Sequence, residues 1–181
     1  VVGCGGIHGI ADIERQVDAG TKKTFYPPIE ALRLGGDRVV TTPPHYAYLK
    51  ISEGCNNRCT YCAIPYIRGA YRSRPQDDIV REAVELEDMG AKEIVLIAQD
   101  TTRYGEDLGP LFTLTTLIDA IINATKSVKL RLLYCYPDMI TDDLTEKIRT
   151  CDSVIKYIDL PIQHISDRML KAMNRRGDGA L

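Results

Sequence analysis

The sequence has no long hydrophobic run and no secretion signal. None of its 181 residues belongs to a stretch approaching the roughly 20 consecutive apolar residues that cross a bilayer. The N-terminus also lacks the basic, apolar and small-residue order of a signal peptide. We therefore expect a cytoplasmic protein without a membrane partner.

The sequence also has little excess of charge of either sign. Its 23 Lys and Arg residues and 25 Asp and Glu residues give a formal net charge of −2. Such a balance does not attract polyanions in general, so a nucleic-acid contact would need a local basic patch or a further domain. Direct RNA binding is not indicated by these residues.

Six cysteines are present, and their spacing suggests metal binding. Without an export signal a disulfide framework is not expected, because reducing compartments keep thiols free. Three of the cysteines form the pattern Cys55-x-x-x-Cys59-x-x-Cys62. Three thiolates can hold a cubane iron-sulfur cluster, and because such clusters normally have four cysteine ligands, one iron stays open for a substrate or cofactor. The alternative is a zinc site with His164 or another cysteine as fourth ligand, although zinc sites usually show a second pair of ligands at close spacing.

The other three cysteines give weaker signals. Cys135 and Cys151 lie in or beside predicted core elements, where a free cysteine behaves as a small hydrophobic residue, so we interpret both as packing residues. Cys4 stands between glycines without a neighbouring cysteine, and it could belong to an ordinary loop or to a second cluster site.

The chain divides into three parts by composition. Residues 1–20 contain a short amphipathic helix around 10–17 and resemble the tail of a preceding domain. Residues 21–44 carry two Pro-Pro pairs and one Gly-Gly pair, which predict a linker. Residues 45–181 form the main domain.

Strand-like and helix-like segments alternate regularly through the main domain. Strands are predicted at 46–51, 93–98, 129–136 and 157–162, and helices at 77–89, 114–124, 141–149 and 166–174. This order predicts an α/β fold with a parallel sheet, either an open doubly wound sheet or a βα barrel. Four βα units cannot close a barrel, so a barrel would be partial.

Polar residues gather where the predicted strands end, which is the edge where active sites form in βα folds. They comprise the cysteine pattern, Gln99 and Asp100, Tyr134 and Tyr136, and Gln163 and His164. Their coincidence predicts one site, although each pair alone could also be a helix cap, a turn or a hydrogen-bonded strand end.

Three arginines, Arg68, Arg72 and Arg74, are interleaved with tyrosines after the cysteine pattern. They could bind a carboxylate or phosphate, but a solvated loop also explains such a run.

The cysteine pattern, with Tyr61 before its third cysteine, resembles the signature of the radical S-adenosylmethionine enzymes. The segments 45–55, 63–69 and 73–75 are similar to the methylthiotransferase branch of these enzymes. Within that branch, 99–105, 134–137 and 157–164 are similar to the members that modify an aspartate of the twelfth small-subunit ribosomal protein. The resemblance covers residues 45–176.

This resemblance implies a partial barrel with four of about six βα units. It implies a [4Fe-4S] cluster on Cys55, Cys59 and Cys62, with S-adenosylmethionine on the open iron through its amino and carboxylate groups. An electron passed to the sulfonium would give a 5′-deoxyadenosyl radical that takes hydrogen from the aspartate β-carbon, where a methylthio group is then attached. By position, the residues expected to hold S-adenosylmethionine are Ser73, Arg74, Gln99 and Gln163.

The resemblance further implies that the chain is a fragment, truncated at its C-terminus and inactive by itself. An N-terminal methylthiotransferase α/β domain would hold a second [4Fe-4S] cluster, and a C-terminal β-barrel domain would help to bind the target. The expected partners are the ribosomal protein or the small ribosomal subunit, and a flavodoxin-like or ferredoxin-like electron donor. The alternatives are a tRNA adenosine methylthiotransferase and, in another class, a non-catalytic zinc-binding module.

Overall fold

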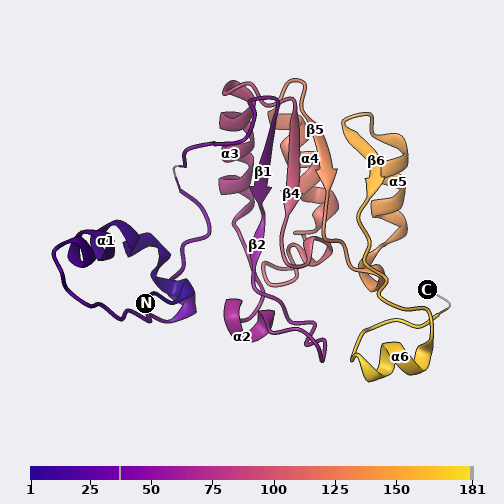
Figure 1. The fold of residues 1–181 in the computed structure, drawn as a ribbon. Coiled ribbons are helices and arrows are strands. Elements are labelled where there is room, and N and C mark those ends of the chain that lie inside the picture. The colour runs from indigo at the N-terminus through magenta and orange to yellow at the C-terminus, as the bar shows by residue number, and fades with distance from the viewer. Residues whose placement is uncertain (37, 180–181) are drawn as a thin grey trace.

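The computed structural model describes residues 1–36 and 38–179 and is built around a four-stranded parallel sheet (Figure 1). The strands lie side by side in the order β1 (Tyr46–Lys50), β4 (Glu93–Ile97), β5 (Lys129–Leu132) and β6 (Val154–Ile158). The helices that follow them are α3 (Gln76–Asp88), α4 (Leu114–Ala124), α5 (Asp142–Thr150) and α6 (Asp167–Ala172). All four strands point the same way, so their carboxyl ends meet at one edge of the sheet.

In the part of the chain that the structure describes, helices cover one face of the sheet. Leu49, Leu96 and Leu132 are fully buried and belong to the core formed with α3, α4 and α5. On the opposite face Tyr48 and Tyr157 remain 42% and 48% exposed. A doubly wound sheet has helices on both faces, whereas a barrel wall has them on one.

The predicted α/β class with a parallel sheet is therefore confirmed. The sequential strand order and the one-sided helices favour the barrel over the doubly wound sheet. Closure into a barrel stays a prediction.

Local chemistry explains where the main helices begin and end. The Thr113 hydroxyl accepts from the Thr116 amide and Thr116 returns the contact, which forms a capping box at the start of α4. The Thr141 hydroxyl accepts from the Leu144 amide at the start of α5. After α3 the chain reverses at Gly90, whose φ of 106° suits glycine.

Three predicted boundaries were wrong. The strand predicted at 129–136 ends at Leu132, because Tyr134 adopts a left-handed φ of 59° that a strand cannot contain. The strand predicted at 157–162 lies at Val154–Ile158, since Pro161 has no amide hydrogen and the apolar residues beside it belong to a loop. The helix predicted at 166–174 extends only from Asp167 to Ala172.

Several short elements near the cysteines were not predicted. Strands β2 (Ser52–Glu53) and β3 (Arg72–Ser73) form an antiparallel pair that encloses the cysteines and the helix α2 (Ile64–Arg68). Two-residue strands leave too little periodicity to be recognised in a sequence.

The first 36 residues form a small unit beside the sheet (Figure 1). It contains η1 (Cys4–Gly9), α1 (Ile10–Asp18) and η2 (Ile29–Ala31), and α1 confirms the helix expected around 10–17. The segment predicted as a linker is attached to the main body, because the Ile29 carbonyl accepts from the Arg72 guanidinium. The boundaries 1–20, 21–44 and 45–181 stay predictions, and their residues 37 and 180–181 lie outside the described part.

Within the described residues, no helix is long and apolar enough to cross a membrane.

Candidate functional site

The cysteine loop (residues 54–62) leaves β2 at the carboxyl edge of the sheet. It begins at Gly54, whose φ is 79° and where an added Cβ would lie 2.1 Å from the Ala70 carbonyl oxygen. The Cys55 amide donates to the Gly69 carbonyl (3.2 Å), and the Cys62 amide donates to the Cys59 carbonyl (3.0 Å). The first bond attaches the start of the loop to the segment before β3, and the second forms a turn within the loop.

The cysteine side chains are half-buried and border a cavity. Cys59 and Cys62 line a pocket of about 420 Å³ together with Pro65 and Tyr66. Burial raises the pKa of the Cys55 thiol, and the negative charges of Asp100 and the other two cysteines raise it further. Thiolates at this place need a cation to offset their charge, so the thiols and the pocket suit a positively charged metal group.

A buried carboxylate connects the cysteine loop to the end of β4. Asp100 is 0% exposed, and its oxygens accept from Asn57 Nδ2 (2.7 Å), Thr102 Oγ1 (2.6 Å) and Arg103 Nε (3.0 Å). Arg103 Nε also donates to Asn57 Oδ1 (3.0 Å). Asn57 lies between the first two cysteines, so this network positions the loop that carries them.

The same network reaches the turn after β5. The Arg103 guanidinium pairs with Glu106 (2.7 Å) and Asp138 (3.0 Å). The Tyr136 amide donates to Thr102 Oγ1 (3.0 Å). The ends of β4 and β5 are therefore joined to the cysteine loop by one set of buried polar contacts.

Tyr136 lies directly against a cysteine. Its hydroxyl oxygen is 3.6 Å from Cys59 Sγ, and the Arg175 guanidinium lies 4.1 Å from the centre of its ring. Burial raises the pKa of the Tyr136 hydroxyl, and its contact with Cys59 raises it further, so the hydroxyl keeps its proton at neutral pH.

The end of α6 holds the cysteine loop from a second side. The Thr60 amide donates to the Met173 carbonyl (3.0 Å), and Asn174 Nδ2 donates to the Arg58 carbonyl (2.9 Å). These partners are more than 110 residues apart in the sequence.

Ser73 and Arg74, two of the residues expected to hold S-adenosylmethionine, already have partners within the chain. Ser73 Oγ accepts from the Gly105 amide (3.0 Å). The Arg74 side chain is 4% exposed, pairs with Glu82 (2.7 Å) and donates to the Lys50 carbonyl (2.7 Å). These contacts attach β3 to α3 and β1.

The two glutamines differ from Ser73 and Arg74. Gln99 Oε1 is buried and has no hydrogen-bond partner among the described residues, so it can accept from a ligand. Gln163 is exposed and has a left-handed φ of 64°, which places it in a sharp turn after β6. Gln99 Oε1 is thus a buried acceptor without a described partner, whereas Ser73 and Arg74 have partners within the chain.

The arginines that follow the cysteines have internal partners. Arg68 lies 3.4 Å from the fully buried Glu53, and Arg72 donates to the carbonyls of Ile29 and Glu30. These arginines therefore stabilise the fold through contacts within the chain, which accounts for their presence in this segment.

The remaining cysteines lie apart from the cysteine loop. Cys135 is 1% exposed, and burial raises the pKa of its thiol to about 12; Cys151 packs against the same core. Both predicted packing roles are confirmed. Cys4 lies in η1, and its role as a ligand stays a prediction.

The zinc alternative lacks a set of ligands within residues 1–36 and 38–179. No three His, Cys, Asp or Glu side chains of this part converge on a point that could hold a single metal ion. His164 Nδ1 accepts from the Ser166 amide (2.9 Å). In a cubane each thiolate binds a different iron, so the cysteines need not converge on one point.

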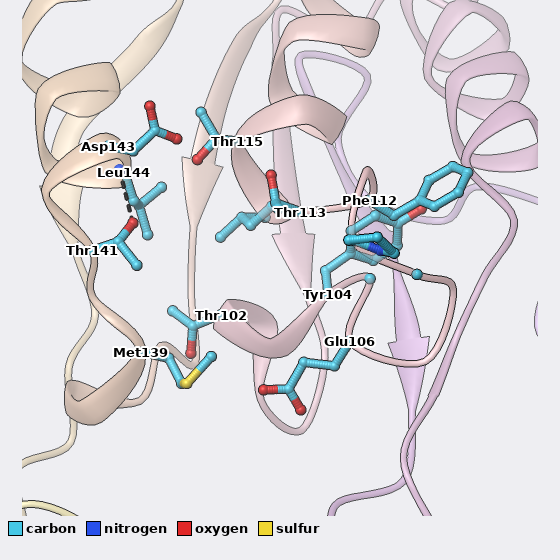
Figure 2. A pocket seen from close by; sticks show the side chains of 14 residues that line it. Thr102, Tyr104, Glu106, Phe112, Thr113, Thr115, Met139, Thr141, Asp143 and Leu144 are labelled. Atoms are coloured by element: carbon cyan, nitrogen blue, oxygen red, sulfur yellow. Dashed lines mark hydrogen bonds between the residues drawn. The ribbon is translucent and has the colours of Figure 1, made fainter.

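A separate pocket of about 550 Å³ lies where α4 and α5 begin (Figure 2). Thr113 and Thr141, which cap these helices, face it together with the apolar Met139 and Leu144. Thr102 links this pocket to the buried network, but none of the predicted site residues lines it.

Residues 49–180 match the Radical SAM superfamily, and the chain belongs to this superfamily. Solved structures support the fold: the radical S-adenosylmethionine methyltransferase TsrM from Kitasatospora setae has a TM-score of 0.58 over 81% of this chain and 30% of its own, at 14% identity. The cobalamin-dependent S-adenosylmethionine radical enzyme OxsB has a TM-score of 0.56 over 74% of this chain and 20% of its own, also at 14% identity.

Curated relatives give a more specific similarity. The chain is 47% identical over 97% of its length to "Ribosomal protein uS12 methylthiotransferase RimO" of Thermoanaerobacter sp. (strain X514) and covers 40% of that protein. It is 47% identical over 93% of its length to the protein of the same name from Clostridium tetani and covers 38% of it. The chain thus spans about 40% of the length of the relatives it matches.

Sequence reasoning did not identify Asn57, Arg103 and Arg175 as residues of this site. Asn57 and Arg103 stand close to residues that the patterns singled out, but nothing local distinguishes them from loop residues. Arg175 contacts residues that only the tertiary structure brings near it.

We expect Gly54→Ala to lower the amount of iron that the chain binds after anaerobic reconstitution. The new methyl group would meet the Ala70 carbonyl and displace the first cysteine. Gly20→Ala is the matched control, because its φ of 80° is nearly the same but nothing lies within 4 Å of the added Cβ. Equal iron content in the two variants would contradict this role of Gly54.

Asp100→Ala should lower the free energy of unfolding by about 3 to 5 kcal/mol, because it leaves Arg103 and Asn57 without their buried partner. Urea denaturation measures this change. Asp78→Ala, which breaks an exposed pair with Arg81, should have little effect. A similar loss in both variants would show that the buried network does not stabilise the chain.

Proposed function

We propose that this chain is part of a radical S-adenosylmethionine methylthiotransferase that adds a methylthio group to the β-carbon of an aspartate of ribosomal protein uS12. The observation that carries the proposal is the cysteine loop, held at the carboxyl edge of a parallel sheet with its thiols beside a pocket. The similarity to proteins named uS12 methylthiotransferase supports the choice of target.

Cys55, Cys59 and Cys62 would hold a [4Fe-4S] cluster and leave one iron open for S-adenosylmethionine. When bound, these groups supply a low-potential electron and a radical precursor that no amino-acid side chain offers. Gln99 Oε1, a buried acceptor without a partner among the described residues, suits the ammonium group of S-adenosylmethionine. Gln163 is a second candidate for contacts with this cofactor, from the turn after β6.

The residues of the chain itself position the cofactors. Asp100, Asn57 and Arg103 hold the cysteine loop against β4. Ser73 and Arg74 would act indirectly, because they fix the β2–β3 pair from which the loop emerges. The packing of the helices on one face of the sheet fixes the positions of the strand ends. A reaction at an unactivated carbon requires such fixed positions, because the reacting atoms must be held close together.

The complete protein would have further parts and partners. We propose a second [4Fe-4S] cluster on an N-terminal methylthiotransferase domain and a flavodoxin-like or ferredoxin-like electron donor. The target would be uS12, free or in the small ribosomal subunit, and the protein would act in the cytoplasm.

Anaerobic reconstitution with iron and sulfide should give a brown chain with the broad visible absorption of a [4Fe-4S] cluster, and S-adenosylmethionine should alter the spectrum of its reduced form. Cys59→Ala should abolish the colour, because it removes a ligand. Cys151→Ala should retain it, because Cys151 only packs against the core. A colourless reconstituted chain that binds one zinc ion would refute the proposal.

Deletion of the gene that encodes this chain should remove the mass of one methylthio group from ribosomal protein uS12, with tRNA nucleosides unchanged. Mass spectrometry of both fractions from the same culture checks this outcome. If a methylthiolated adenosine is lost while uS12 keeps its modification, the target is tRNA and the proposed substrate is wrong.

A further inference from the structure

Tyr136 is the only residue outside the cysteine loop for which the structure describes a side-chain hydrogen bond to one of the three loop cysteine sulfurs. Its hydroxyl oxygen lies 3.6 Å from Cys59 Sγ, a distance that suits a hydrogen bond to the large sulfur atom. Tyr136 comes from the segment after β5, which is 77 residues further along the chain. The contact is therefore made by the tertiary structure and not by the loop.

The chemistry of a cluster ligand decides which of the two atoms donates. A cysteine that binds iron is a thiolate and has no proton to donate. The Tyr136 hydroxyl is then the donor of this contact, and Cys59 Sγ is the acceptor. This contact changes the charge density on a sulfur that would belong to the cluster.

Arg175 holds the Tyr136 ring in place. Its guanidinium lies over the ring at 4.1 Å, and its two terminal nitrogens donate to the Pro161 carbonyl (2.6 Å) and the Tyr61 hydroxyl (3.3 Å). Arg175 itself is only 8% exposed, and its two hydrogen bonds are partly buried. These contacts fix the guanidinium at two points, on the ring that carries the hydroxyl facing Cys59.

We propose that Tyr136 tunes the reduction potential of the cluster by donating a hydrogen bond to Cys59, and that Arg175 is the positioning residue for its ring. The inference rests on the proposed function, because it needs the cluster on Cys55, Cys59 and Cys62. Reduction adds negative charge to a cluster, and a hydrogen bond to a ligand sulfur stabilises that charge. Tyr136 therefore raises the potential and makes the cluster easier to reduce.

The test is a redox titration of the anaerobically reconstituted 181-residue chain, followed by electron paramagnetic resonance. Tyr136→Phe removes only the hydroxyl oxygen, and we expect its midpoint potential to be more negative than that of the wild type at equal iron content. Tyr157→Phe is the matched control, because Arg131 lies 5.3 Å from the centre of the Tyr157 ring but no contact with a cysteine sulfur is described for it. This control should titrate as the wild type does.

Arg175→Met tests the positioning role separately. It should shift the potential in the same direction as Tyr136→Phe, and in the double variant the two shifts should not add, because Arg175 acts through Tyr136. Additive shifts would overturn the assignment of Arg175.

The remaining outcomes separate this inference from the proposed function. A wild-type chain without a cluster would refute the proposed function itself. A wild-type cluster whose potential is unchanged by Tyr136→Phe, or changed equally by Tyr157→Phe, would refute only the role of Tyr136. If Tyr136→Phe prevents cluster loading, Arg175→Lys gives the same test, because it keeps the hydroxyl and loosens its support; an unchanged potential in that variant would also refute the inference.

Discussion

The burial of the Asp100 carboxylate is the constraint on which the candidate site depends. A charge that is fully removed from water is tolerated only when other groups replace the lost hydration, and here Asn57, Thr102 and Arg103 do so. Because Asn57 belongs to the cysteine loop and Asp100 to the end of β4, satisfying the carboxylate also sets where the cysteines lie. The need of Asp100 for hydrogen-bond partners thus fixes the position of the loop that carries the three cysteines.

Two separate sets of contacts hold the cysteine loop. The buried network attaches its middle to the sheet, and residues 172–174 at the end of α6 attach its second half through Thr60 and Arg58. Between these attachments the thiols of Cys59 and Cys62 remain beside a pocket. A loop supported in this way can keep polar and reactive groups accessible without losing its shape, which is what a cofactor site on a βα fold requires.

Much of the fold could be predicted because it follows from local periodicity. The alternation of apolar strands with amphipathic segments indicated the parallel sheet and the helices, and the spacing of three cysteines indicated the candidate metal site. The errors lie where a backbone conformation overrides the hydrophobic pattern: Tyr134 turns out of β5 with a left-handed φ, and Pro161 cannot join a strand. The β2–β3 pair was missed because a strand of two residues is too short to show an alternation of apolar and polar side chains. Ser73 and Arg74 have partners within the chain, and their expected contact with S-adenosylmethionine stays a prediction.

The sequence by itself determined the order of strands and helices and the spacing of the three loop cysteines, since these depend on residues that are neighbours in the chain. Only the tertiary structure decided that Asp100 would bind Asn57, that Tyr136 would reach Cys59 and that Arg175 would stack on Tyr136. The physical reason is that these partners are 39 to 77 residues apart and are brought together by the packing of parallel strands, whose register depends on the whole core and not on any local pattern.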